Sequence, residues 1–242
     1  MNTRFFILVF VVTLWLTLFS SCNSQQHNED LKSTLKHYNI CLIIDGTDLI
    51  TGESGIPKLK KGDIIELANT LSCKGVGSLY VGYIDSNADN NAWAIFEWSD
   101  TPPIYPGPKP SHEQIKKYST KIDAYDTAKK KYDDKLSSTL EAFEHDCDNI
   151  FNMAYSNEVA RQKYGSDING AVNIAVKFLK SDEVSKSHII LISDGVDNVH
   201  KELASIPASI ELLIVNTNAA KHQFEQAKEF VTLKQVTNYI LK

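Results

Sequence analysis

Residues 38–49 have the sequence YNICLIIDGTDL, and they contain the strongest indication of the fold. The run from Ile40 to Ile44 is apolar, rich in β-branched residues and too short for a buried helix. These properties are typical of a strand that is buried on both faces, so we place it at the centre of a parallel sheet. The run ends on the polar sequence DGTD, and in open α/β sheets ligands bind outside the carboxyl ends of the strands. Asp45 and its neighbours are therefore the first candidates for a functional site.

A second stretch repeats this design further along the chain. Residues 188–193 read HIILIS, and Asp194 and Gly195 follow directly. Parallel strands bring their carboxyl ends to the same edge of a sheet. We therefore expect Asp45 and Asp194 to share one polar site. Ser193 lies beside them, but no recognisable base accompanies it, so we assign it no role as a nucleophile.

Strand and helix patterns alternate through most of residues 37–242, which at 43% hydrophobic composition support one sizeable core. Further strands are predicted at 76–84, 92–98 and 209–215, and helices at 60–73, 165–180, 199–205 and 219–241. The short link between 76–84 and 92–98 implies an antiparallel hairpin. The predicted fold class is α/β, with a doubly wound, mostly parallel sheet, one antiparallel edge strand and helices on both faces.

An insertion at about 99–161 interrupts this pattern. Residues 101–110 contain five prolines and a glycine, so they form neither a helix nor an inner strand. Apolar residues, many of them tyrosines, then recur at helical spacing from Ser111 to about Met153. One continuous helix would be about 60 Å long, which is longer than a small domain is wide. We therefore expect a break or a protruding arm, and we predict that the insertion is peripheral to the core sheet.

The N-terminus has the pattern of a targeting segment. Phe5–Phe19 is apolar but shorter than the roughly twenty residues that span a bilayer. The sequence LFSSC at its end resembles the lipobox of bacterial lipoproteins, which implies a signal peptide at 1–21, lipidation of Cys22 and a polar tether at 22–36. Ordinary secretion with cleavage near Ser21 is the alternative. Asn23 follows the cysteine, which favours the outer over the inner membrane of the cell envelope.

The net charge bears on which partners the protein binds, and the cysteines bear on whether it forms disulfide bonds. The net charge is −5 and no basic patch is interleaved with aromatic residues, so we expect no nucleic-acid partner. Cys41 lies in the central strand, where a free thiol behaves as a small apolar side chain. Cys73 and Cys147 could pair in an oxidising compartment, and the sequence leaves their disulfide state open.

Three separated pieces of sequence occur in an order that matches a known family. They are DGT at Asp45, GSDI at Gly165 and ISDG at Ile192, each beside the end of a predicted strand or the start of a helix. With the hairpin between them, they resemble the von Willebrand factor type A domain over residues 37–242, the insertion excepted. The resemblance implies a Rossmann-type fold that binds a protein partner and is not an enzyme.

In that family three loops form a metal-ion-dependent adhesion site, in which Mg²⁺, or Mn²⁺ or Ca²⁺ in its place, also binds an acidic side chain of the partner. The metal ligands that the resemblance implies here are Asp45, Thr47, Ser166 and Asp194. Leu49 stands where the family has a serine and offers the metal no ligand, so water must take its place. Asp48 is one residue away from that position. A metal-free alternative stays open, in which Ser166 and Asp167 cap a helix.

Other motifs support different chemistry less well. The sequence IIDGT also resembles the first motif of haloacid dehalogenase-like phosphatases, but Ile43 stands where the nucleophilic aspartate is required. Residues 85–89 begin like a calcium loop, yet Asn90 replaces its glycine and Phe96 its final glutamate, which favours a polar turn. The acidic residues around His145 face different directions on a helix, which favours a solvated surface.

The sequence thus predicts a membrane-tethered lipoprotein whose type A domain binds a protein partner through a degenerate Mg²⁺ site. The alternative is a metal-free scaffold that binds its partner through the long helical insertion.

Overall fold

The computed structural model describes residues 36–45, 55–84, 87–108, 111, 114–156, 165–179, 187–197, 199, 202–203, 205–216 and 223–242. The chain divides into two compact units, Met1–Leu35 and Lys36–Lys242, and every described residue belongs to the second. The predicted signal peptide and Cys22 lie outside the described residues. Within the described ranges, no helix has both the length and the apolar character that crossing a membrane requires.

Six strands form one sheet in the order β3-β2-β1-β4-β5-β6. They are β1 (His37–Asp45), β2 (Val76–Ile84), β3 (Ala94–Trp98), β4 (Ser187–Ile192), β5 (Ile210–Val215) and β6 (Lys228–Phe230). All neighbouring pairs are parallel except β2 and β3, which are antiparallel. The predicted α/β class, with a mostly parallel sheet and one antiparallel edge strand, is confirmed.

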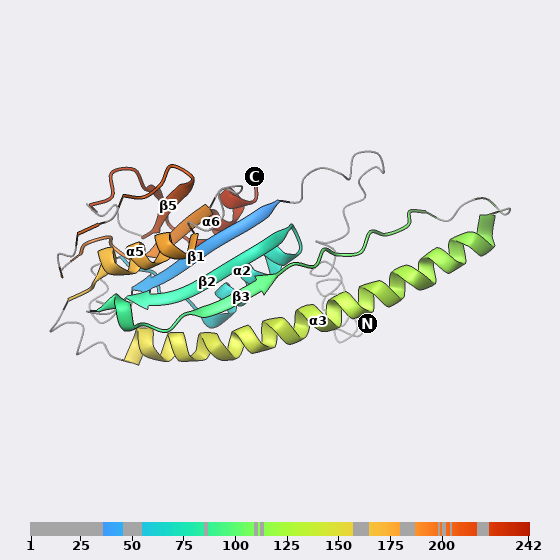
Figure 1. Ribbon diagram of the computed structural model, residues 1–242, viewed down its shortest axis with the longest axis horizontal. Helices are drawn as coiled ribbons and strands as arrows, with labels where there is room; N and C mark the ends of the chain where they lie inside the picture. Colours follow the sequence, from blue (N-terminus) through green and yellow to red (C-terminus); the bar gives the residue numbers. More distant parts are fainter. Residues whose placement is uncertain are drawn as a thin grey trace, which may run out of the picture. The chain divides into compact units, whose positions relative to one another are not determined.

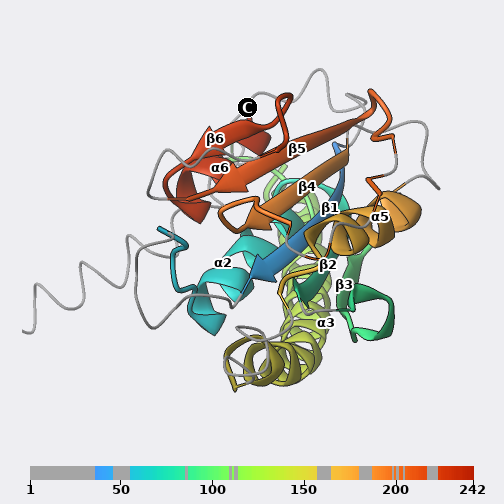
Figure 2. The ribbon, with the colours of Figure 1, turned by 90° about the vertical axis from the view of Figure 1, so that its left-hand side faces the viewer.

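Helices cover both faces of this sheet (Figures 1 and 2). The elements α2 (Lys61–Ser72), α3 (Ile115–Ser156) and α6 (Leu233–Ile240) pack on one face, while α5 (Ile168–Leu179) and the 3₁₀ turn η2 (Ala88–Asn90) pack on the other. The central strand β1 supplies both cores, because successive side chains point to opposite faces. Ile40, Leu42 and Ile44 belong to the first core, whereas Cys41 and Ile43 belong to the second.

The helix α3 is unbroken over 42 residues, which agrees with the expected protruding arm and not with a break. It contains no proline or glycine, the usual causes of a sharp kink. Its N-terminal half extends past the sheet beside the extended residues 99–108 (Figure 1). We call residues 99–108 and 115–131 the arm. Tyr118 donates a hydrogen bond to the carbonyl of Gly107 at 2.8 Å, and the rings of Tyr105 and Tyr125 meet edge to face at 5.3 Å.

The C-terminal half of α3 belongs to the main core, so the prediction that the whole insertion is peripheral is wrong. Phe143, Cys147 and Ile150 are buried against β2, β3 and α2, and the ring of Phe143 lies 5.4 Å from that of Phe96. The sheet face over β2 and β3 needs a cover, and this half of α3 provides it. The helical spacing of apolar residues is the same in the arm and in the core half of α3. The sequence pattern therefore gave no sign that the two halves differ in burial.

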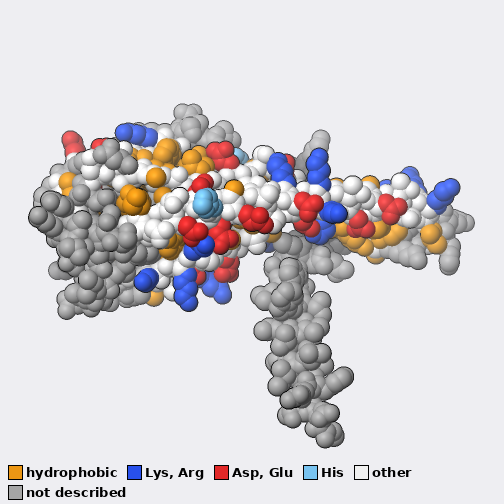
Figure 3. Space-filling view, turned by 90° about the horizontal axis from the view of Figure 1, so that it is seen from below, with side chains coloured by type: hydrophobic (Ala, Val, Ile, Leu, Met, Phe, Trp, Pro, Cys, Tyr) orange, Lys and Arg blue, Asp and Glu red, His pale blue; other side chains and the backbone are white. Residues whose placement is uncertain are grey.

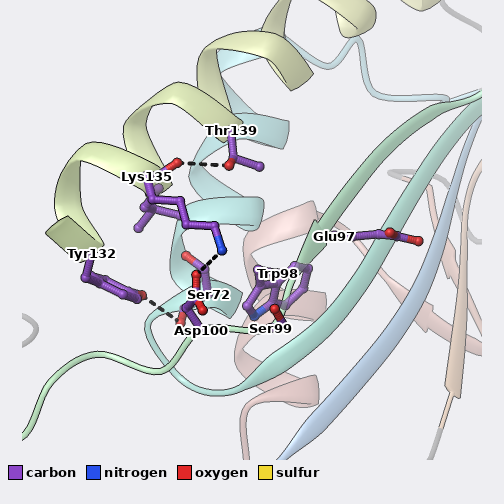
Figure 4. Close-up of a pocket in the computed structure, with 9 residues that line it drawn as sticks. Ser72, Glu97, Trp98, Ser99, Asp100, Tyr132, Lys135 and Thr139 are labelled. Atoms are coloured by element: carbon purple, nitrogen blue, oxygen red, sulfur yellow. Dashed lines mark hydrogen bonds and ion pairs between the residues drawn. The ribbon is translucent and has the colours of Figure 1, made fainter.

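The arm leaves the sheet at a cluster of polar contacts that Figure 4 shows. Lys135 forms an ion pair with Asp100, and the hydroxyl of Tyr132 donates to the carbonyl of Ser72 at 3.3 Å. A small cavity of about 50 Å³ lies among these residues and Trp98. These contacts join the end of β3, α2 and the middle of α3 at one point.

Two predicted helices differ from the structure. Residues 199, 202–203 and 205, within the predicted helix 199–205, are not helical. Of the predicted helix 219–241, only Leu233–Ile240 is helical, because Lys228–Phe230 pairs with β5 as the edge strand β6. Thr232 then starts α6 with a capping box, in which its side chain accepts from the backbone of Gln235 and Gln235 bonds back.

The three cysteines of the described residues are free thiols, so Cys73 and Cys147 do not pair. Cys41 and Cys147 are completely buried, on opposite faces of the sheet. Burial is the main cause that raises the pKa of Cys147 to about 12 and holds the pKa of Cys41 well above its usual value. Both thiols therefore stay protonated at neutral pH.

Candidate binding site at the carboxyl edge of the sheet

The site is built where two neighbouring strands end. Ile44 of β1 is in register with Ile192 of β4, so the next residues, Asp45 and Ser193, meet at the carboxyl edge. Asp45 is only 1% exposed. The hydroxyl of Ser193 donates to Oδ2 of Asp45 at 2.8 Å, and the same hydroxyl accepts from the backbone N–H of Gly195 at 3.0 Å. This chain of bonds fixes the direction of the Asp45 carboxylate.

Asp194 lies in the turn that follows this contact. Its Oδ1 accepts a hydrogen bond from the backbone N–H of Val196 at 2.9 Å, and the side chain is only partly buried. Gly195 has a φ of 73°, a left-handed conformation that glycine adopts at little cost. Asn216, just after β5, donates to the carbonyl of Ser193 at 3.2 Å. The turn thus directs a second carboxyl group to the same edge as Asp45.

The N-terminus of α5 contributes the third part of the site. Ser166 and Asp167 are buried directly before the helix. Asp167 caps it, since its Oδ1 accepts from the N–H of Gly170 at 2.9 Å, while its Oδ2 accepts from Ala88 at 3.0 Å. A Cβ on Gly170 would lie 2.3 Å from the Asp167 carboxylate, so this close approach requires glycine. Asp167 is therefore a structural cap that also holds η2 in place.

The turn after β4 is tied to α5 by a second set of contacts. Asp197 accepts a hydrogen bond from the N–H of Asn169 at 3.1 Å, which satisfies another donor of the first helical turn. Gln223 bonds to the side-chain oxygen of Asn169 at 2.6 Å, and its own N–H donates to the carbonyl of Gly195 at 3.4 Å. Hydrogen bonds between residues that are distant in sequence therefore hold the candidate loops together.

Three of the four predicted ligand residues, Asp45, Ser166 and Asp194, lie at this edge. Thr47 lies outside the described residues, as do Leu49 and Asp48. Sequence reasoning missed the function of Ser193 because it was considered only as a nucleophile. Its position immediately before an Asp-Gly turn, in register with Asp45, was the available signal. The contacts of Asp197 and Gln223 had no local signal, because each depends on how distant loops pack.

The donor set at this edge consists of carboxylate and hydroxyl oxygens. Such hard oxygen ligands fit Mg²⁺, which usually keeps several waters when it binds one or two protein carboxylates. In the part of the chain that the structure describes, no three His, Cys, Asp or Glu side chains gather in a way that could hold a metal ion. The oxygen donors of Asp45, Ser166 and Asp194 fit a site in which the ion keeps several waters.

The other polar motifs have structural partners. Asn87 accepts a hydrogen bond from the N–H of Asp89 at 3.3 Å and so caps the turn η2, which agrees with a polar turn. Near His145, the carboxylates of Asp148 and Glu144 lie 2.8 Å and 2.9 Å from the amine of Lys61. Their hydrogen bonds raise the pKa of Lys61 above its ordinary value. These contacts join α2 to α3 on the solvated surface.

No protein-family model matches this chain, and no curated protein matches its sequence.

Proposed function

We propose that this protein is a membrane-tethered lipoprotein whose domain, similar to the von Willebrand factor type A domain, binds a protein partner through a weak Mg²⁺ site. The observation that carries the proposal is the hydrogen bond from Ser193 to Asp45, with Asp194 in the next turn. It brings the first and third motifs of the resemblance to one edge, where two separate strands end. The tether and the lipidation of Cys22 rest on the N-terminal sequence alone.

In this proposal Asp45, Thr47, Ser166 and Asp194 hold the ion. Bound Mg²⁺ would attract an acidic side chain of the partner to this edge. Ser193 orients Asp45 by donating to one of its carboxylate oxygens. Asp167, Asp197 and Gln223 hold the loops in position, which lowers the entropic cost of binding. Leu49 contributes no oxygen, so affinity for the ion stays low until the partner supplies a carboxylate.

A thermal-unfolding titration with MgCl₂ tests the metal site. A ligand that binds only the native state stabilises it by RT ln(1 + [L]/Kd), so excess Mg²⁺ should raise the Tm. Asp194→Ala should abolish this rise, while Leu49→Ser should enlarge it by restoring a hydroxyl. Asp126→Ala, at an exposed position on α3, is the matched control and should respond like the wild type.

An unchanged Tm would contradict the metal site. If Mg²⁺ and Mn²⁺ leave the Tm of the wild type and of Leu49→Ser unchanged, the carboxyl edge is a capping cluster without a metal.

Intact-mass measurement of the native protein tests the tether. We expect a mature chain that begins at a lipidated Cys22, and an unlipidated chain for Cys22→Ser. A wild-type N-terminus without lipid would contradict the anchor and leave the metal site as a separate question.

The arm supports a second candidate function, a scaffold that binds its partner through the helical insertion. The arm residues Ile104 and Tyr105 are large and apolar, and they are 63% and 53% exposed. Figure 3 shows hydrophobic side chains along the arm with acidic and basic ones beside them. If partner capture from envelope extract survives Asp194→Ala but is lost in Ile104→Ser/Tyr105→Ser, the arm is the binding element.

A further inference from the structure

A pocket of about 500 Å³ opens at the amino end of the sheet, on the face that α5 covers. It lies at the opposite end of the strands from Asp45, because it is lined by the first residues of β1 and β2 and the last residues of β3. Its volume is within the range of small-molecule sites. The lining includes Asn39, Ser78, Tyr80, Glu97, Ser99 and Phe178.

A row of polar side chains crosses four strands at this level. Glu97 is in register with Ser78, Ser78 with Asn39, and Asn39 with Ser187. The hydroxyl of Ser78 donates to Oδ1 of Asn39 at 3.0 Å. Asn39, Ser78 and Ser187 are each less than 10% exposed, and among the described residues the Ser187 hydroxyl makes no hydrogen bond. Buried polar groups lower stability unless they are bonded, so the Ser187 hydroxyl is the member of this row that core packing leaves unexplained.

The surrounding residues on the same face are apolar, which isolates the row. Cys41 and Ile43 continue β1, and Ile189 and Leu191 continue β4, all within the core beneath α5. The alternation of side chains places Asn39 and Ser187 on that face too, one step closer to the amino end. The polar groups therefore begin where the helix ends and the pocket opens.

An aromatic wall borders the pocket beside this row. The rings of Tyr80 and Phe178 stack with centroids 5.0 Å apart and planes within 10° of each other. Trp93 meets Phe178 edge to face at 5.2 Å, which holds the stacked pair in place. Phe178 covers one face of Tyr80, and both residues line the pocket. The wall is rigid because the three rings support each other.

Glu97 places a carboxylate at the rim of the pocket. Figure 4 shows its side chain directed away from the cluster of Tyr132 and Lys135, on the other side of β3. Its side chain is exposed and forms no ion pair or hydrogen bond with the described residues. It lies across from Ser78 on the neighbouring strand. One strong acceptor thus stands near hydroxyl and amide groups, and the imidazole-bearing residue His37 lines the same pocket.

We propose that this pocket binds a saccharide. A sugar ring has apolar C–H faces and a fringe of hydroxyl groups, which match an aromatic ring beside a polar row. A carboxylate such as Glu97 accepts hydrogen bonds from two adjacent hydroxyls. A small amine would also bind a carboxylate and an aromatic ring. However, an ammonium group is much smaller than this pocket. It also has no acceptor, so it cannot bond to the neutral donors of the pocket.

Saturation-transfer NMR on the full-length mature chain tests this site. The probes are glucose, galactose, N-acetylglucosamine and maltose, with lysine methyl ester as the amine. We expect a saturation signal from at least one sugar and none from the amine. Glu97→Gln should weaken sugar binding about tenfold, the effect of losing a charged hydrogen-bond acceptor. Glu66→Gln, an exposed position on α2, is the matched control and should bind like the wild type.

Ser99→Trp gives an independent test that leaves the core unchanged, because Ser99 is exposed and lines the pocket. The indole should fill the pocket and abolish the sugar signal, while the far-UV circular dichroism stays that of the wild type. The proposal is overturned if no sugar gives a signal, if the signal persists in Ser99→Trp, or if only the amine binds.

Discussion

At the scale of single residues, Asp167 shows how one residue can join two elements. Its carboxylate caps α5 through Gly170 and bonds the N–H of Ala88 in η2, while its own backbone carbonyl accepts from Ala171. Both carboxylate contacts are buried, so their loss cannot be replaced by water without a rearrangement. Asp167 therefore links the hairpin between β2 and β3 to the start of α5, next to the candidate site.

Asp167→Ala should lower the free energy of unfolding by about 2–4 kcal/mol, the sum of a lost N-cap and an unsatisfied buried N–H. Urea unfolding of the wild type and the variant measures this difference. Asp126→Ala, exposed on α3, should change stability by less than about 0.5 kcal/mol. Equal midpoints for Asp167→Ala and the wild type would contradict the capping role.

At the scale of elements, α3 combines two environments in one continuous helix. Its C-terminal half buries Phe143, Cys147 and Ile150 on the sheet, while residues 115–131 contact the extended segment 99–108. Burial of an aromatic core side chain stabilises a domain by about 3–5 kcal/mol, as judged by truncation to alanine. The arm lacks fully buried apolar side chains in its described part, so it contributes much less to stability.

Shortening the arm should leave the domain folded. The ion pair of Asp100 with Lys135 marks where the two sides of the arm come together, so residues 102–130 can be replaced by about six Gly/Ser residues. Cooperative urea unfolding should be preserved, with a midpoint close to that of the wild type.

The comparison variant removes the whole of residues 99–161. It should fail to fold cooperatively, because it deletes the cover of β2 and β3. If it unfolds as cooperatively as the shortened variant, α3 is peripheral along its entire length.

At the scale of the whole molecule, two buried thiols make stability depend on alkaline pH. The pKa of Cys147 rises from 9.0 to about 12 in the folded chain, chiefly because of burial, with Asp146 and Asp148 adding to the effect. Between these values the folded state binds more protons than the unfolded state. The stabilisation is therefore complete below about pH 9 and is lost as the pH rises toward 12.

The contribution of Cys147 can be isolated with Cys147→Ala. In the wild type this thiol should lower the free energy of unfolding by about 1 kcal/mol for each pH unit above 9. Cys147→Ala is less stable at neutral pH because it leaves a cavity, but its stability should fall less steeply between about pH 9 and pH 11. Urea unfolding at several pH values measures the slopes. Cys73→Ala, at a partly exposed position, should keep the wild-type slope, and equal slopes for all three chains would refute the assignment.

The layered α/β fold and its central strand could be predicted from local patterns in the chain. Apolar runs such as Ile40–Ile44 carry this information locally, because the middle of a strand that is buried on both faces is almost entirely apolar. The same reasoning located Asp45 and Asp194 at one edge, since parallel strands end on the same side. This prediction did not require knowing that β1 and β4 are neighbours in the sheet.

Which residues meet, and which half of α3 belongs to the core, depends on contacts between distant parts of the chain. The helical period of α3 is the same in both halves, and the difference lies in whether β2 and β3 are beneath it. Likewise, Lys228–Phe230 became a strand because β5 offered an unpaired edge, although the local pattern suggested a helix. The contacts of Ser193 with Asp45 and of Asp197 with Asn169 join segments 148 and 28 residues apart. Such pairs depend on the free energy of packing whole elements, which no single stretch of sequence contains.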